Sequence, residues 1–519
     1  MEKEFQFKKQ GEVRVRIAPS PTGNLHIGTA RAALFNYIFA KQNKGNFVLR
    51  IEDTDRERSK KEFENNIIEG LKWLGLEWNE GPDINGDYGP YRQSERIEIY
   101  SKYLEKLISE EKAYYCFCSP EDLEEQRQYQ LSNGEAPHYL GTCTNLSKKE
   151  TAKKLADKKP FVIRFKVEPK KIKFNDLIRG DIEFDSALMG DVVIAKNSKT
   201  PLYNFAVVVD DFEMRISHVI RGEDHISNTP LQILLQEALG FPRPSYAHLP
   251  LILGPNRAKL SKRDGATVSV LDYKEEGYLP EALINFVSFL GWNPGNDREI
   301  YSLASLVKEV SVEKFQKQGA IFDIKKLDFL NGFYIRQKSS ERLAELCIPY
   351  LIKGDLITPK GIIHEENPEA LPREIKNFEI METGEEISKE QIEKIISLEQ
   401  ERMKKLSDIA ESTGYFFKDK LKYEKELLKW KNAGSEETKI IIDKLEKILF
   451  EIKEGDWSKE NLTGILMEEA NREGDRGKIL WPLRVALTGE KASPGPFEVA
   501  EILGKEKTLK RLKEAYGNI

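Results

Sequence analysis

The chain has 519 residues, of which 32% are charged and 39% hydrophobic, and its formal net charge is −5. This length allows several domains with large cores. The net charge argues against tight nucleic-acid binding over the whole surface, although it leaves room for a basic stripe on one face. No run approaches about 18 apolar residues, and residues 1–10 lack the apolar core of a signal peptide, so we expect a cytoplasmic protein. Four cysteines are too few for a disulfide framework.

The first informative stretch is residues 13–29, which read VRVRIAPSPTGNLHIGT. Alternating apolar residues at 13, 15 and 17 predict a strand, the prolines and Gly23 predict a turn, and the apolar spacing from Ala30 predicts a helix. The start of that helix, around His26, offers free backbone N–H groups and the positive end of the helix dipole, which suit a polyphosphate. Gly28 allows a ligand to approach the backbone closely.

A second predicted strand, FVLRI at 47–51, ends in an acidic run at 52–55. Strand, helix and strand form a βαβ unit, which predicts a parallel sheet. Ligands bind at the carboxyl ends of the strands in such sheets. Both the Pro/Gly turn and the acidic run lie at that edge, so we expect a binding site there.

The rest of the chain divides into an insertion, a resumed α/β pattern and a helical end. Residues 112–195 read as an insertion, because they hold three of the four cysteines, charged helical runs and short strands. A later helix is expected to start with Thr229 as N-cap and Pro230 at its first position. From about residue 266 the strand signal disappears and helical periodicity dominates. Further strands are predicted at 192–195, 206–209, 217–220 and 246–253.

Several of these strings resemble one known family. The string RIAPSPTGNLHIGT at 16–29 resembles the first signature of class I aminoacyl-tRNA synthetases in the form found in bacterial-type glutamyl-tRNA synthetases, and KLSKR at 259–263 resembles their second signature. Thr29 stands where many class I enzymes carry a second histidine, and the glutamyl branch commonly has threonine there. The strings RIEDTD, WLGL, GPYRQSER and WPLRVALTG resemble the same family, so the likeness covers nearly the whole chain.

The resemblance implies a fold and a domain order. The expected fold is α/β, a Rossmann-like parallel-sheet catalytic domain with an inserted α/β domain, followed by an all-α carboxyl-terminal half. The expected boundaries are 1–111 and 196–260 for the catalytic domain, 112–195 for an acceptor-end-binding insertion, 261–336 for a stem-contact domain with the KLSKR loop, and 337–412 and 413–519 for two helical anticodon-binding domains. The family is usually monomeric.

The resemblance also implies glutamate activation with ATP, followed by transfer to the terminal ribose of tRNA(Glu). Such chemistry needs positioning and charge neutralisation more than covalent help from the protein. The implied catalytic residues are His26, Lys259 and Lys262. The implied ATP-binding residues are Pro19, Gly23, His26, Gly28, Thr29, Lys259, Ser261 and Lys262. Mg²⁺ is expected on the ATP, held by phosphates and water, so we assign it no protein ligand.

Glutamate carries two carboxylates and one ammonium, so its pocket needs two cations and one anion. The residues that the resemblance offers for it are Arg16, Ala18, Ser20, Glu52, Tyr203 and Arg221. Arginine suits a carboxylate because its fork binds both oxygens. We expect Arg16, with Tyr203, to take the side-chain carboxylate, and the choice between Arg16 and Arg221 stays open. Val207 stands where some members of the family carry a polar pocket residue.

The cysteines Cys116, Cys118 and Cys143 follow a C-x-C-x24-C spacing. By resemblance this spacing indicates one structural zinc ion, which needs four ligands. Tyr139 matches a variant of the family in which a tyrosine completes the set, and its neighbour His138 is the rival fourth ligand. Three free thiols are the alternative.

The helical carboxyl-terminal half is expected to read the anticodon, with Arg402 against its last base, although an exposed helical arginine is usually just solvated. One alternative to an enzyme specific for tRNA(Glu) is an enzyme that also charges tRNA(Gln) with glutamate. A glutaminyl-tRNA synthetase is a less favoured alternative. A shortened paralogue, a small nucleotidyltransferase and a catalytically inactive tRNA-binding protein fit the length or the motifs less well.

Overall fold

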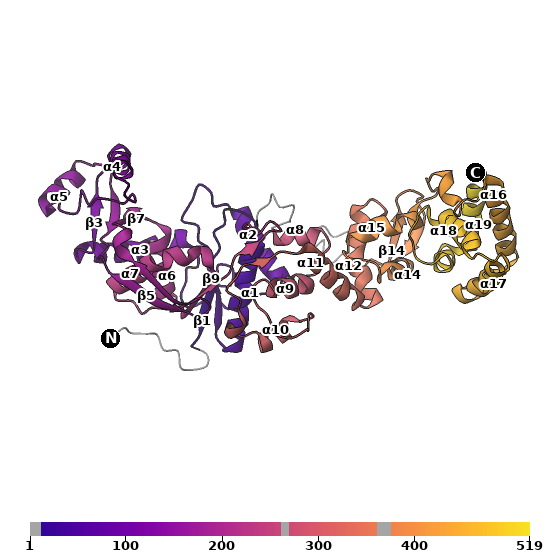
Figure 1. Cartoon of the computed structure of the whole chain (residues 1–519), viewed down its shortest axis with the longest axis horizontal. Helices are drawn as coiled ribbons and strands as arrows, with labels where there is room; N and C mark the ends of the chain where they lie inside the picture. Colours follow the sequence, from indigo (N-terminus) through magenta and orange to yellow (C-terminus); the bar gives the residue numbers. More distant parts are fainter. Residues whose placement is uncertain (1–11, 261–268, 361–374) are drawn as a thin grey trace. The chain divides into compact units, whose positions relative to one another are not determined.

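The structure is a computed structural model that describes residues 12–260, 269–360 and 375–519. It divides into two compact units (Figure 1). The first contains the described residues up to Lys274 and Pro280–Leu327, and the second contains Glu275–Leu279 and the described residues from Asp328 to Ile519. Among the described residues, no helix combines the length and hydropathy that a bilayer crossing requires.

The predicted βαβ unit is present at the start of the first unit. Strand β1 (Arg14–Ile17) pairs in parallel with β2 (Asn46–Leu49), and α1 (Ile27–Gln42) connects them. Strands β9 (His218–Gly222) and β10 (Ser245–Leu249) form a second parallel pair, connected by α7 (Thr229–Leu239). The N–H of Ser217 donates to the carbonyl of Arg14 at 2.9 Å, so β9 lies beside β1. The carboxyl ends of the two pairs therefore meet at one edge.

Helices α2 (Lys61–Trp73), α3 (Ile97–Ser109) and α6 (Tyr203–Glu213) complete this part of the chain. The prediction of a strand at 206–209 is wrong, because these residues lie inside α6. The run is short and wholly apolar, and periodicity alone does not separate a buried strand from a buried helix in such a run. All of it packs in a core with α3, α7 and the sheet residues Val48 and Val219.

Two further predictions shift by a few residues. The strand expected at 246–253 is broken at Pro250 into β10 and β11 (Ile252–Leu253), and β11 pairs with β12 (Ala320–Ile321). Asn228, and not Thr229, is the N-cap of α7. The Thr229 hydroxyl instead donates to the carbonyl of His225 at 3.2 Å.

The segment that contains the cysteines forms an antiparallel sheet in the order β3-β4-β7-β8. Helices α4 (Pro120–Ser132) and α5 (Lys148–Ala156) each begin with a serine capping box. Hairpin β5 (Lys171–Asp176) and β6 (Gly180–Asp185) does not join this sheet. Strand β5 pairs with β10, so the hairpin extends the catalytic sheet to the order β6-β5-β10-β9. The strands of the separate sheet are β3 (Ala113–Cys116), β4 (Val162–Phe165), β7 (Val192–Asn197) and β8 (Thr200–Pro201).

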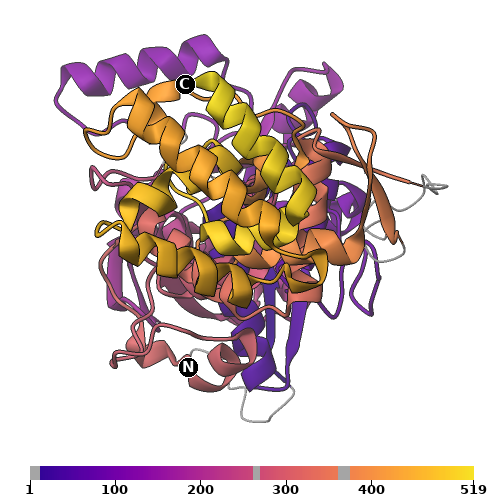
Figure 2. The same cartoon turned by 90° about the vertical axis from the view of Figure 1, so that its right-hand side faces the viewer.

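The rest of the chain is predominantly helical, as predicted. Among its described residues, β12 and a three-stranded antiparallel sheet depart from this prediction, since strands of two to four residues give too little alternation to detect. In the second unit α16 and α19 pack along one another (Figure 2).

The bounds of these later elements are α8 (Val270–Glu275), α9 (Pro280–Ser288), α10 (Leu303–Glu309), α11 (Ile324–Arg336), α12 (Ser340–Lys353), β13 (Ile357–Pro359), β14 (Asn377–Ile380), β15 (Glu386–Ser388), α14 (Lys389–Glu399), α15 (Asp408–Thr413), α16 (Ser435–Glu451), α17 (Lys459–Arg472), α18 (Gly477–Thr488) and α19 (Pro496–Asn518).

Candidate active site

A pocket of about 440 Å³ lies where β1, β2, β9 and β10 end. This is the edge at which parallel sheets bind ligands. Gly23 does not line the pocket, and Ser261 and Lys262 lie outside the described residues. The predicted site residues that do line it are Arg16, Ala18, Pro19, Ser20, His26, Gly28, Thr29, Glu52, Tyr203, Arg221 and Lys259.

The N-terminus of α1 forms one wall of the pocket. His26 is the N-cap, and its Nδ1 accepts a hydrogen bond from the N–H of Gly28 at 3.0 Å. Because Nδ1 accepts, a neutral ring carries its proton on Nε2. A Cβ at position 28 would lie only 3.3 Å from His26 Nδ1, so glycine leaves the room that this ring needs. The helix end thus combines oriented N–H groups with a fixed imidazole.

A network of buried charged side chains supports the pocket. Arg16 donates to Asp211 through Nε and Nη2, at 3.0 and 3.3 Å. Arg50 connects the same carboxylate to Glu52, with contacts of 2.8 and 3.0 Å. Arg50 also pairs with Asp210 at 3.7 Å, and Arg96 pairs with that carboxylate at 2.7 Å. Three guanidinium groups and three carboxylates therefore balance one another inside the protein, which is the condition under which buried charges persist.

The pKa values of Glu52 and Asp211 shift in opposite directions in this network. Burial raises the pKa of Glu52 above its ordinary value, despite the opposing charges of Arg50 and Arg16. Burial also acts to raise the pKa of Asp211, but the adjacent Arg16 and Arg50 outweigh it and hold that pKa below its ordinary value. The two arginines therefore favour the ionised form of Asp211, whereas a further cation beside Glu52 would favour its ionised form.

Unlike Arg16, Arg221 has neutral hydrogen-bond partners. Its Nη2 donates to Thr229 Oγ1 and Gln232 Oε1, each at 2.9 Å, and its Nε donates to His248 at 3.1 Å. Within the described part of the chain, no carboxylate forms an ion pair with Arg221, and its buried Nη1 has no hydrogen-bond partner. A buried donor without a partner costs free energy, so this nitrogen is suited to an incoming acceptor.

Tyr203 and Lys259 bring a hydroxyl and an ammonium group to the pocket. The Tyr203 hydroxyl lies 3.1 Å from His225 Nδ1. Burial and the nearby Glu52 raise the pKa of Tyr203 to about 12, so the hydroxyl keeps its proton and can donate it in a hydrogen bond. Lys259 is exposed, and its Nζ contacts Asp224 at 3.3 Å. Its long side chain therefore places a cation at the pocket wall.

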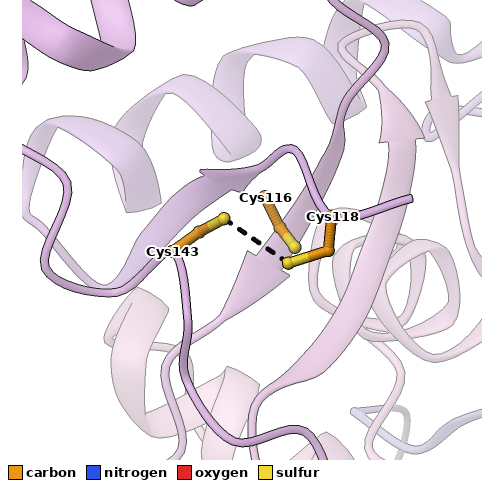
Figure 3. A group of neighbouring side chains, drawn as sticks. All are labelled: Cys116, Cys118 and Cys143. Atoms are coloured by element: carbon orange, nitrogen blue, oxygen red, sulfur yellow. Dashed lines mark hydrogen bonds between the residues drawn. The ribbon is translucent and has the colours of Figure 1, made fainter. Parts of the chain in front are cut away.

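The three predicted cysteine ligands converge in the antiparallel sheet region (Figure 3). Their Sγ atoms all lie within 4.8 Å of one another, with Cys118 and Cys143 separated by 3.7 Å. The Tyr139 hydroxyl lies 3.4 Å from the Cys116 sulfur and 3.6 Å from that of Cys118. His138 instead directs Nδ1 to Gln130 and to a backbone carbonyl. This cluster can hold a metal ion.

Arg402, in the second unit, lies in a turn after α14 and not within a helix. Its Nη1 contacts Glu399 at 3.5 Å. Burial raises the pKa of Glu399, and Arg402 opposes that rise. The sequence prediction for Arg402 as an anticodon residue stays a prediction.

The sequence interpretation missed Arg50, Asp211, Asp176 and His248. Arg50 stands directly before the acidic run, and the pair at 210–211 follows an apolar run, so both were visible as charges beside apolar segments. Their partners lie up to 195 positions away, which no local pattern reveals.

Comparison with known proteins identifies the family of the chain. Residues 12–329 match the family model described as tRNA synthetases class I (E and Q), catalytic domain, and residues 342–516 match the model described as anticodon binding domain. The chain therefore belongs to the class I tRNA synthetases of the E and Q group, as the sequence motifs predicted.

Full-length relatives narrow this class. The chain is 44% identical to a glutamate–tRNA ligase of Carboxydothermus hydrogenoformans, over 97% of this chain and 100% of that protein. It is 46% identical to glutamate–tRNA ligase 1 of Caldicellulosiruptor saccharolyticus, over 97% and 98%. The crystal structure of a glutamate tRNA ligase from Elizabethkingia meningosepticum in complex with its amino acid superposes with a TM-score of 0.83 at 35% identity, covering 98% of this chain and 99% of that one. Within its class, the chain is a member of the glutamate–tRNA ligase family.

Proposed function

We propose that this protein activates L-glutamate with ATP and transfers the glutamyl group to the 3′-terminal ribose of tRNA(Glu). The observation that carries this proposal is the charge pattern of the pocket. Arg16, Arg31, Arg221 and Lys259 line it together with Glu52 and Asp224, beside a helix N-terminus. Arg31 donates to two backbone carbonyls and Asp224 contacts Lys259, so Arg16, Arg221 and Glu52 are the charges assigned to the amino acid. These groups complement two carboxylates, one ammonium and a polyphosphate.

In this proposal Arg16 and Arg221 each bind one carboxylate of glutamate, with Tyr203 donating beside Arg16 to the side-chain carboxylate. Glu52 accepts the substrate ammonium, whose positive charge favours the ionised form of this buried acid. Ala18 and Ser20 line the same pocket. Glutamine would place an amide where the side-chain carboxylate meets Arg16 and Tyr203 and so lose a charge-assisted hydrogen bond, which should make the site favour glutamate.

The activation step follows from positioning. An oxygen of the substrate α-carboxylate attacks the α-phosphorus of ATP in line, and the bond to pyrophosphate breaks. His26, Gly28, Thr29 and the α1 N-terminus hold the phosphates, while Lys259 and Lys262 neutralise the leaving pyrophosphate. Pro19, Gly23 and Ser261 are the remaining predicted ATP contacts. Mg²⁺ on the ATP would supply further charge neutralisation. A ribose hydroxyl of tRNA then attacks the acyl-adenylate and releases AMP.

For the cysteine cluster we propose one structural zinc ion held by Cys116, Cys118, Cys143 and Tyr139. Tetrahedral zinc with bonds of about 2.3 Å places thiolate sulfurs about 3.8 Å apart. The separation of 3.7 Å between Cys118 and Cys143 fits that spacing. Metal analysis of protein purified without added zinc tests this, and less than about a tenth of an equivalent would contradict it.

For the second unit we propose anticodon recognition, with Arg402 reading the last base. Since tRNA charging serves protein synthesis, we also propose a cytoplasmic monomer. The decisive experiment measures glutamate charging of tRNA(Glu) and tRNA(Gln) transcripts side by side. Charging of tRNA(Glu) alone supports a discriminating enzyme and makes Arg402 the residue to mutate. Charging of both indicates an enzyme that also acts on tRNA(Gln) and refutes the role of Arg402. Charging of neither would refute the proposed activity.

A further inference from the structure

Three buried polar residues stand on adjacent strands of the catalytic sheet. In the order β5-β10-β9, they are Asp176, His248 and Arg221. His248 and Arg221 are register partners in the parallel ladder between β10 and β9. Asp176 and His248 are 1% and 0% exposed, so neither side chain reaches solvent. Only Arg221 lines the pocket.

Both hydrogen bonds among them have their donor on the Arg221 side, so Arg221 donates to His248 and His248 donates to Asp176. His248 Nδ1 lies 2.6 Å from Asp176 Oδ2, and Arg221 Nε donates to His248 Nε2 at 3.1 Å. Arg221 has no lone pair to offer, so His248 Nε2 must be the acceptor and Nδ1 must carry the proton. Burial lowers the pKa of His248 and outweighs the opposing hydrogen bond with Asp176, which keeps the ring neutral as this arrangement requires.

The carboxylate of Asp176 is held as an anion. Its Oδ1 accepts hydrogen bonds from the backbone N–H groups of Ile178, Arg179 and His248, at 3.0, 2.9 and 3.3 Å. Burial alone would raise its pKa, but these bonds and the one from His248 outweigh burial, so the pKa lies below its ordinary value. A negative charge therefore lies one imidazole away from the guanidinium of Arg221.

We propose that Asp176 and His248 are positioning residues that hold Arg221 for a substrate carboxylate, an inference that rests on the proposed glutamate-binding role of Arg221. Arg16 has two of its nitrogens on Asp211. Asp176 contacts Arg221 through His248 and leaves Nη1 without a hydrogen-bond partner among the residues that the structure describes. Asp176 and His248 together supply a counter-charge for the buried guanidinium of Arg221 and fix its orientation. They do not occupy Nη1, the nitrogen proposed to meet the substrate.

The sharpest perturbation is Asp176→Asn. An asparagine that keeps its oxygen on the three backbone N–H groups must place its NH₂ against His248 Nδ1. The ring then moves its proton to Nε2, where it faces the N–H of Arg221 at about the distance of the present hydrogen bond. We expect the KM for glutamate to rise about tenfold while the KM for ATP stays within about twofold, since one charge-assisted hydrogen bond is lost.

Two substitutions of His248 separate positioning from packing. His248→Asn can keep a donor near the Nδ1 position, toward Asp176, but it has no acceptor that reaches Arg221, so we expect the same rise in glutamate KM. His248→Gln can place its carbonyl near the Nε2 position and should restore the KM to within about threefold of wild type. Glu183→Gln, an exposed change on strand β6 of the same hairpin, is the matched control and should leave both constants unchanged.

The test measures tRNA(Glu) charging at varied glutamate and varied ATP, together with the thermal midpoint of each variant. It also follows the ¹⁵N shifts of the His248 ring, whose tautomer should change in Asp176→Asn. The variant Arg221→Lys separates the proposed glutamate-binding role of Arg221 from the proposed positioning role of Asp176 and His248. If it leaves the glutamate KM unchanged, the proposed role of Arg221 fails. If it raises that KM but Asp176→Asn and His248→Asn do not, or if they raise the KM for ATP equally, the positioning inference is overturned.

Discussion

Arg50 offers the most direct test of how the pocket is built. It is 0% exposed and connects Glu52 to Asp211 beneath the pocket. Replacing it by methionine keeps much of the volume but leaves three buried carboxylates, Glu52, Asp210 and Asp211, with one cation fewer. Removing one partner of a buried ion pair costs about 3–5 kcal/mol of unfolding free energy. At about 2 °C per kcal/mol, Arg50→Met should lower the melting temperature by roughly 6–10 °C.

The same change should affect substrate binding. Without the charge of Arg50, the pKa of Glu52 rises further, and the carboxylate proposed to meet the substrate ammonium is lost in part. We therefore expect the KM for glutamate to rise about tenfold in the charging assay.

A matched control lies eight positions further along the chain. Arg58 forms an exposed contact with Asp55, and Arg58→Met should change neither the melting temperature nor the KM. A melting temperature of Arg50→Met within about 2 °C of wild type, with an unchanged glutamate KM, would refute the reasoning.

Three further predictions follow from single contacts. Gly28→Ala should lower kcat about tenfold without lowering the melting temperature, because the new Cβ crowds His26 while alanine suits a helix; unchanged kcat would contradict this. Burial lowers the pKa of His218 from 6.5 to about 4, so the unfolded chain binds more protons between these pH values and stability falls as pH drops through that window. His218→Gln should flatten the dependence of melting temperature on pH there, and an equally steep curve would argue against the assignment. Cys118→Ser should abolish zinc retention and raise the KM for tRNA(Glu) with that for glutamate unchanged, and full zinc content in this variant would exclude the ligand assignment.

The selectivity expected of the pocket follows from its unequal arginines. Arg16 is already neutralised by Asp211, whereas Arg221 has only neutral hydrogen-bond partners among the described residues. Arg221 therefore has more uncompensated positive charge than Arg16, and a ligand carboxylate at Arg221 compensates it. Glutamine would also bring its α-carboxylate to Arg221, so discrimination against glutamine should depend on Arg16 and Tyr203, where its amide would replace the side-chain carboxylate.

Much of the site could be predicted from the sequence, because it is built from short local segments. The strand, turn and helix of residues 13–42 use alternation, proline and glycine, and helical spacing, and each depends only on near neighbours. The βαβ topology then requires that the ends of β1 and β2 meet, which brings Arg16, His26 and Glu52 to one pocket.

The sequence by itself thus determined the class of fold, the family, and many of the groups that face the pocket. Only the tertiary structure decided how these groups are supported. The run at 206–209 is buried and lies in a helix, a choice that its apolar pattern left open, and Asp211 meets Arg16 across 195 positions. Asp176, His248 and Arg221 become neighbours only when β5, β10 and β9 pair. Local conformation depends on adjacent residues, whereas the charge and hydrogen bonding of a buried group depend on whichever distant segments pack against it.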